Sequence, residues 1–92
     1  EYNMKAKEEI EILRERIDMI DIEIVDKLAE RMRISEKIGR YKKEHNMAIH
    51  QEDRFAKVIE NITKEANKKK ISAEFICAIY KIIHSESKKN QL

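Results

Sequence analysis

Two basic side chains in the first half of the chain have the type and spacing to hold a small anion. Arg31 and Lys42 are 11 residues apart. On a helix that separation is close to three turns, so both side chains project to one side, about 16 Å apart along the axis. Two long side chains that lean toward each other from these positions can converge on one small ligand. Because arginine binds carboxylates through two parallel hydrogen bonds, a dicarboxylate would suit such a site.

A third cation, Arg14, borders the same apolar stripe but cannot join that site within one chain. It precedes Arg31 by 17 residues, or about 25 Å along a helix. In a dimer with antiparallel long helices, Arg14 of one chain would approach Arg31 of the other. The spacing also permits a plainer arrangement, in which Glu30 and Glu36 pair locally with Arg31 and Lys42. Geometry alone leaves both arrangements open.

The elements that would position these residues are three helices, predicted over about 6–44, 51–68 and 72–90. Apolar residues recur at helical spacing through the first range, and Ser72 followed by Glu74 is typical of a helix start. The main apolar stripe comprises Ile10, Leu13, Ile17, Ile20, Ile24, Leu28, Met32 and Ile38. A second face carries Ile12, Met19, Ile22, Val25 and Ala29. We therefore expect an all-α fold, with residues 1–92 forming a single domain.

The first predicted helix is too long for the other two to cover. About 37 residues of helix extend about 55 Å, whereas a compact domain of this size has a radius of gyration of about 12 Å. The apolar surface left exposed would mark an interface. The sequence therefore predicts an intertwined helical homodimer in which the long helices pack on each other.

Composition excludes several other classes of function. The net charge is +2, with one cysteine, one glycine and no proline, so we expect no nucleic-acid or membrane partner and no disulfide framework. No apolar run is long enough to cross a bilayer and no signal segment is visible, and a reducing, cytoplasmic location is expected. His45, His50 and His84 are dispersed and are expected in loops or on the surface. No metal-ligand cluster or phosphate-binding loop is present, so no metal or cofactor is expected.

Several motifs in order resemble the all-helical chorismate mutases. They run from Arg14 to Gln91, over most of the chain. The motifs are Arg14-Glu-Arg-Ile-Asp18-Met-Ile-Asp21, Leu28-Ala-Glu-Arg31, Lys37-Ile-Gly39-Arg-Tyr-Lys42, the segment from Ile49 to Arg54, and Ser87 with Gln91 four residues later.

The resemblance implies rearrangement of chorismate to prephenate in aromatic amino acid biosynthesis, a pericyclic reaction that needs no cofactor. It implies that Arg31, with Arg14 donated by the partner chain, holds the two carboxylates. Lys42 and Gln91 would donate hydrogen bonds to the ether oxygen. The implied catalytic residues are Lys42, Gln91 and Arg31. The implied substrate-binding residues are Arg14, Arg31, Lys42, Arg54, Ser87, Gln91 and Gln51.

Two positions depart from the family's pattern and leave other functions open. In many members the residue directly after the arginine that matches Arg54 is an acid, and here it is Phe55. Three residues before that arginine many members have an aspartate, and here the residue is Gln51. We expect Phe55 to be a core residue of the 51–68 helix rather than a substrate contact. The same acid is missing in the related isochorismate-pyruvate lyases of salicylate synthesis, which are the first alternative. A non-catalytic helical dimerisation module is the second. The residues do not indicate whether this domain is fused to another enzyme or whether it is regulated.

Overall fold

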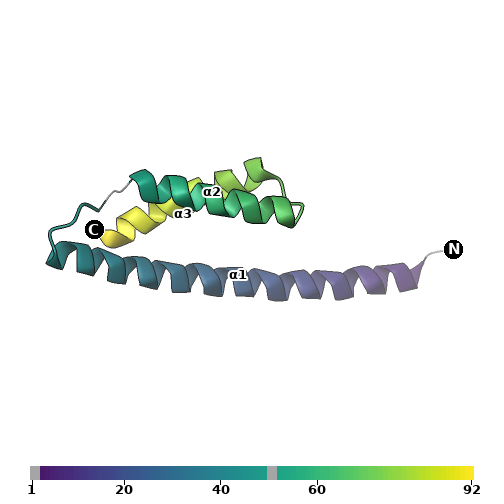
Figure 1. Ribbon diagram of the computed structural model, residues 1–92. Helices are drawn as coiled ribbons and strands as arrows, with labels where there is room; N and C mark the ends of the chain where they lie inside the picture. Colours follow the sequence, from purple (N-terminus) through teal and green to yellow (C-terminus); the bar gives the residue numbers. More distant parts are fainter. Residues whose placement is uncertain (1–2, 50–51) are drawn as a thin grey trace. The chain divides into compact units, whose positions relative to one another are not determined.

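The chain forms three α-helices in the computed structural model, which describes residues 3–49 and 52–92. They are α1 (Met4–Glu44), α2 (Glu52–Lys68) and α3 (Ala73–Gln91), and these described ranges contain no strand (Figure 1). The prediction of an all-helical chain with three helices is confirmed. In the same ranges, no helix has the length and apolar character to cross a membrane.

The chain divides into two compact units, residues 1–31 and residues 32–92, and α1 contributes to both. The first, the N-terminal unit, is a single stretch of helix. Its start is capped by Asn3, whose side-chain oxygen accepts a hydrogen bond from the Ala6 N–H at 3.0 Å. Arg14 pairs with Glu11 at 2.8 Å, and both side chains are mostly exposed. An exposed pair of this kind contributes little to stability.

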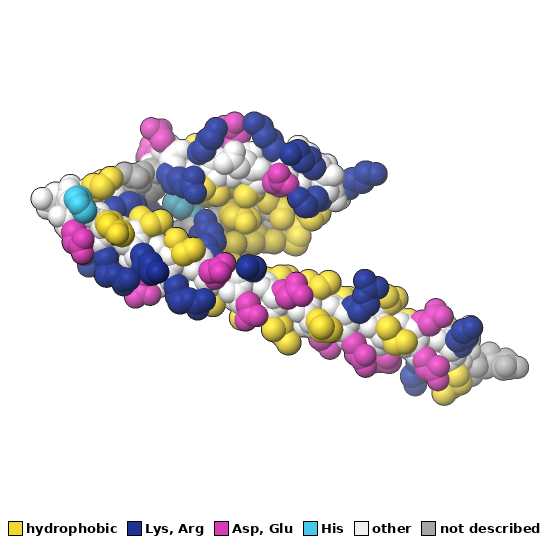
Figure 2. All heavy atoms as spheres, turned by 60° about the horizontal axis from the view of Figure 1, so that its bottom comes forward, with side chains coloured by type: hydrophobic (Ala, Val, Ile, Leu, Met, Phe, Trp, Pro, Cys, Tyr) yellow, Lys and Arg dark blue, Asp and Glu magenta, His cyan; other side chains and the backbone are white. Residues whose placement is uncertain are grey.

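Large apolar side chains of the N-terminal unit are exposed to solvent in the single chain. Their exposed fractions lie between 48% and 65%. These residues are Met4, Ile10, Ile12, Leu13, Ile17, Met19, Ile20, Ile22, Ile24 and Val25. Figure 2 shows yellow side chains standing between charged ones along this stretch of helix. So much exposed apolar surface is typical of a protein interface.

The second, the C-terminal unit, contains the end of α1 together with α2 and α3. The helices α2 and α3 lie side by side and run antiparallel (Figure 1). Ala66 of α2 is the one hydrophobic side chain among the described residues that is buried, at 4% exposure. Around it, half-buried apolar side chains from both helices fill the contact. From α2 these are Phe55, Val58, Ile59 and Ile62, and from α3 Ile76, Ile79, Tyr80 and Ile83.

Both α1 and α2 end in the same hydrogen-bonded turn. After α1, Asn46 takes a left-handed conformation (φ 52°), and the Met47 N–H donates to the Lys42 carbonyl at 2.8 Å. After α2, Lys70 is left-handed (φ 59°), and the Ile71 N–H donates to the Ala66 carbonyl at 2.9 Å. This is the Schellman motif, which satisfies the last carbonyls of a helix and reverses the chain. The first of these turns directs residues 47–49 back past Lys42.

The start of α3 is fixed by a local cap. The Ser72 hydroxyl accepts a hydrogen bond from the Phe75 N–H at 3.2 Å, and Glu74 lies in the first turn. Both features favour a helix start, because they satisfy or complement its exposed N–H groups. The prediction that Ser72 is the N-cap is confirmed.

Candidate functional site

A buried lysine joins the ends of α1 and α3 in the C-terminal unit. The Lys42 ammonium donates to the side-chain oxygen of Gln91 at 2.6 Å and to the backbone carbonyl of Ile49 at 2.7 Å. Lys42 is only 9% exposed. The structure therefore brings together two residues that the sequence predicts to be catalytic.

A second pair of polar residues extends this contact along the helices. The Ser35 hydroxyl donates to the backbone carbonyl of Ser87 at 2.9 Å, and the Gln91 amide nitrogen donates to the Ser35 hydroxyl at 3.3 Å. Ser35 is 5% exposed and Ser87 is 7% exposed. We call Ser35, Lys42, Ser87 and Gln91 the polar cluster. Ser35 contacts Ser87, and Lys42, further along α1, contacts Gln91, further along α3. The ends of α1 and α3 therefore run parallel here.

Gly39 allows the backbones of these helix ends to approach closely. A Cβ atom at this position would lie 2.6 Å from the Gln91 Cα and 2.7 Å from the Gln91 carbonyl oxygen. Backbone atoms cannot move aside as a flexible side chain can, so any larger residue would push the end of α3 away. From sequence alone, a glycine at position 39 only lowers the stability of a long helix modestly. The structure shows that it also lets the backbone of Gln91 pack directly against α1.

The charge of Lys42 is not balanced by an acid of the described chain. Both of its hydrogen-bond acceptors are neutral oxygens, and no carboxylate among residues 3–49 and 52–92 lies within ion-pair distance of its ammonium. A lysine ammonium has three donors, and two of them are used here. A buried cation held only by neutral groups favours an incoming anion or a developing negative charge.

The other predicted site residues are distributed differently. Arg54 lies in the first turn of α2 with its side chain exposed. Arg14 and Arg31 belong to the N-terminal unit. Gln51 lies outside the described residues. Of the seven predicted residues, the structure thus brings Lys42, Ser87 and Gln91 together.

Ser35 is a member of the cluster that the sequence analysis missed. The available signal was its spacing, because Ser35, Gly39 and Lys42 follow one another at four and three residues and so share one face of a helix. A small polar residue on the face that also carries a glycine and a lysine is typical of close helix packing around a polar contact. Its partners lie more than 50 residues away in sequence, so the spacing alone could not identify them.

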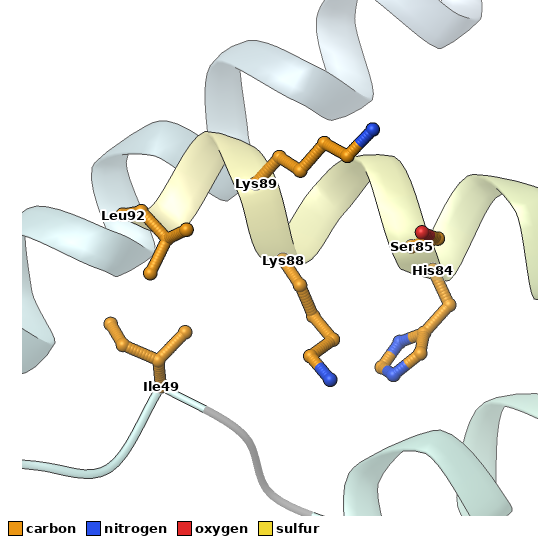
Figure 3. Close-up of a pocket in the computed structure, with 6 residues that line it drawn as sticks. All are labelled: Ile49, His84, Ser85, Lys88, Lys89 and Leu92. Carbon is orange, nitrogen blue, oxygen red and sulfur yellow. The ribbon is translucent and has the colours of Figure 1, made fainter.

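A pocket of about 350 Å³ opens beside the polar cluster. It is lined by Ile49, His84, Ser85, Lys88, Lys89 and Leu92 (Figure 3). His84 is half-buried, so the expectation that it lies in a loop or on the surface is wrong. Helix α3 turns it inward, and its ring stacks on that of Phe55, with centroids 4.1 Å apart and planes 21° apart. Phe55, itself half-buried, therefore backs one wall of the pocket.

The described residues offer no place for a metal ion. Across residues 3–49 and 52–92, no three histidine, cysteine, aspartate or glutamate side chains come close enough together to bind one. The groups that the polar cluster and the pocket present are ammonium, amide and hydroxyl donors. Donors of this kind can bind carboxylates and stabilise an oxygen that gains negative charge.

Comparison with known proteins places this geometry in a family. The family model described as chorismate mutase type II matches residues 13–92, a range that contains the whole polar cluster and the pocket. The chain belongs to the chorismate mutase type II family.

Two relatives of the chain are named for reactions on different substrates. The chain is 33% identical over 84 residues to a bifunctional chorismate mutase/prephenate dehydratase from Buchnera aphidicola subsp. Acyrthosiphon pisum (strain APS), which covers 91% of this chain and 22% of that protein. It is 30% identical over 82 residues to a 4-amino-4-deoxychorismate mutase from Streptomyces pristinaespiralis, which covers 89% of this chain and 64% of that protein. The chain thus spans less than two thirds of either relative. No solved structure gives a significant match.

Proposed function

We propose that this protein is an enzyme, a chorismate mutase that rearranges chorismate to prephenate. The observation that carries the proposal is the buried Lys42 ammonium, which is held by Gln91 and a backbone carbonyl without a balancing acid. In this rearrangement the ether bond breaks as a carbon–carbon bond forms, and the ether oxygen gains negative charge in the transition state. A preorganised ammonium stabilises such a charge more than it stabilises the ground state, and the side-chain oxygen of Gln91 holds this ammonium in place.

The remaining task of such a site is to hold a flexible dianion in its reactive conformer. Carboxylate binding by Arg31 and by Arg14 of a second chain would supply this, with Arg54, Ser87 and Gln51 completing the set. When the reacting atoms are held near each other, the substrate loses conformational freedom on binding and not on the way to the transition state, and the reaction is faster. No residue needs to accept or donate a proton, which fits a cluster made of lysine, amide and hydroxyl groups.

We propose further that the active form is a homodimer and that residues 1–92 act as one domain within it. The exposed apolar side chains of the N-terminal unit support this, because a second copy can cover them. The mutual arrangement would be isologous, so each chain would donate Arg14 to its partner and receive one in return. Two equivalent sites per dimer follow from this arrangement.

Two other substrates are favoured by specific observations. One relative is named a 4-amino-4-deoxychorismate mutase, and Phe55 stands where many family members have an acid that would contact the ring hydroxyl. Without that acid, discrimination between a ring hydroxyl and a ring amine would be weaker. The same absence suits an isochorismate-pyruvate lyase, which would release salicylate and pyruvate.

Incubation of the purified protein with each of three substrates tests the proposal. We expect prephenate from chorismate at a rate far above the uncatalysed reaction, and less turnover of 4-amino-4-deoxychorismate and isochorismate. A matched reaction with Lys42→Ala measures the background. If isochorismate alone were turned over, the lyase function would replace the mutase function.

A ligand-binding measurement separates an enzyme from a non-catalytic helical module. A bicyclic dicarboxylate that mimics the transition state should raise the Tm of the protein, because it binds the folded state alone. Absence of both turnover and stabilisation would leave helical dimerisation as the function.

A further inference from the structure

Two side chains of α3 point together into the pocket beside the polar cluster. Figure 3 shows Lys88 and His84, one turn apart, extending from the same side of α3, the side on which Ile49 also lies. Lys89 extends the other way. Ile49 and Leu92 form an apolar wall at one end of the pocket, and the ring of His84, stacked on Phe55, forms the other. The pocket is therefore apolar at the end formed by Ile49 and Leu92, closed by an imidazole ring at the other end, and cationic between them.

The Lys88 charge has no acid to balance it in the described chain. Within residues 3–49 and 52–92, no carboxylate or hydrogen-bond acceptor lies in contact range of its ammonium. The nearby acid, Glu86, pairs instead with Lys89 at 3.9 Å. No acidic residue of the described chain lines the pocket either. Because Lys88 is half-buried, its charge loses part of its hydration and favours an anionic partner.

The pocket adjoins the polar cluster through two residues. Ile49 lines the pocket and its carbonyl accepts the hydrogen bond from Lys42, and Leu92 follows Gln91 directly. Successive helical residues are rotated by about 100°, so Lys88 is turned about 100° from Ser87 and about 60° from Gln91 around α3. The pocket and the cluster are thus neighbouring strips of one surface. A ligand that contacts Lys42 and Gln91 can therefore extend along this surface toward Lys88.

The volume of the pocket also fits part of a small organic anion. About 350 Å³ is at the lower end of the range for small-molecule sites. We propose that Lys88 is an additional substrate-binding residue, which receives one carboxylate of the dicarboxylate substrate in this pocket, with the His84 ring as its wall. This inference rests on the proposed function, because it places the substrate of that reaction here.

Steady-state kinetics of charge-removing variants tests the inference. Lys88→Met should raise the KM for chorismate about tenfold or more and change kcat less than about threefold, because a carboxylate contact is made equally in the ground and transition states. Lys88→Arg should keep most of the affinity, since it keeps the charge. Lys81→Met is the matched control: it removes an exposed charge from the same helix, seven residues earlier and outside the pocket, and should leave the KM within about twofold.

A binding experiment distinguishes a carboxylate contact from a structural role. The bicyclic dicarboxylate mimic and its two monomethyl esters are titrated into the wild type and Lys88→Met. A direct contact predicts that the variant loses affinity for the diacid and for one monoester, and loses none for the monoester that blocks the contacted carboxylate. Equal loss for all three ligands, or an unchanged KM in Lys88→Met, would overturn the inference while the mutase function stood. A wild-type protein without turnover would overturn both.

Discussion

The two units of this chain contrast in how their functional side chains are held. In the C-terminal unit, Lys42 is fixed by two hydrogen bonds to residues from elsewhere in the same chain. In the N-terminal unit, Arg14 is mostly exposed and pairs with Glu11, three residues away. The N-terminal unit therefore exposes cations and apolar side chains to solvent, whereas the C-terminal unit already holds part of the proposed site. Substitutions in the two units should fail in different ways.

The largest expected effect is at Lys42. Lys42→Ala removes the ammonium beside Gln91, and we expect kcat to fall about 10²–10³-fold while the fold survives. Lys42→Arg should also be poor, because the planar guanidinium has a different shape and donor geometry. Steady-state kinetics, with circular dichroism to check folding, measures both.

Lys37→Ala is the control for this comparison, since Lys37 is an exposed lysine on the same segment of α1. It should retain nearly full activity and stability. Near-full activity of Lys42→Ala would show instead that the buried ammonium has no catalytic role.

A second prediction addresses the N-terminal unit and its dependence on a partner. Arg14→Ala and Arg31→Ala should each be nearly inactive alone. If each site combines Arg31 of one chain with Arg14 of the other, a mixed dimer contains one intact site. Random mixing makes half of the dimers mixed, so activity should recover to about a quarter of the wild-type value. The measurement is turnover after refolding the two variants together.

Subunit exchange must be verified independently, for example by native mass spectrometry of differently tagged chains. An inactive mixture in which mixed dimers are present would refute the shared site. Gel filtration of the wild type gives the complementary result, because a monomer at micromolar concentration would leave Arg14 without a site to enter.

The sequence predicted local features of both units well. Helical spacing of apolar residues predicted an all-helical chain, and the pattern around Ser72 predicted its cap, because both depend on residues within a few positions of one another. Contacts between distant segments were not derivable in this way. The Ser35 contact with Ser87 and the stack of Phe55 on His84 depend on how the helices register against each other.

The candidate site was predictable in part, and mainly through resemblance to a family. Periodicity suggested that Arg31 and Lys42 could share a ligand, but it allowed local pairing with acids as well. The link between Lys42 and Gln91, 49 residues apart, came from the motifs of the family. Lys88 was missed, because a lysine next to another lysine near the end of a helix is usually solvated. Its place in the pocket depends on the positions of Ile49 and Leu92, which the structure gives and the sequence does not.

A third prediction probes the close packing of the C-terminal unit at Gly39. Gly39→Ala places a Cβ against the Gln91 backbone, so the end of α3 must shift. We expect a loss of about 1–3 kcal/mol in the free energy of unfolding from overpacking, reduced by about 1 kcal/mol because alanine favours helix. Activity should fall about tenfold as Gln91 moves from its position. Urea denaturation and steady-state kinetics measure the two effects.

Arg40→Ala is the control for this prediction, because it introduces alanine at the next position, where the side chain is exposed. Its free energy of unfolding should change by less than about 0.5 kcal/mol. If Gly39→Ala proved more stable than the wild type and fully active, helix propensity would outweigh packing, and the close approach of the two helix ends would not matter.

The smallest expected effect concerns an exposed ion-pair network on α2. The hydrogen bond from Lys69 and the charge of Lys68 lower the pKa of Glu65 from its ordinary value of 4.5. A lowered pKa in the folded state means that the ionised form stabilises the fold at neutral pH. This contribution is complete above about pH 4.5 and disappears as the pH falls through the lower folded-state value. Glu65→Gln should therefore lower the Tm by roughly 2 °C or less at pH 7. At a pH low enough to protonate Glu65 in the folded protein, it should have no effect.

Glu23→Gln is the matched change in the N-terminal unit, because no cation of the described residues lies within ion-pair distance of Glu23. Its effect on the Tm should be the same at both pH values, since it breaks no ion pair. A pH-independent effect of Glu65→Gln would show that the lysines of α2 do not act on this carboxylate. A pH-dependent effect of Glu23→Gln would point to a cation supplied by the partner chain. The second outcome would extend the contrast between the units, because even the surface charges of the N-terminal unit would then depend on a second copy.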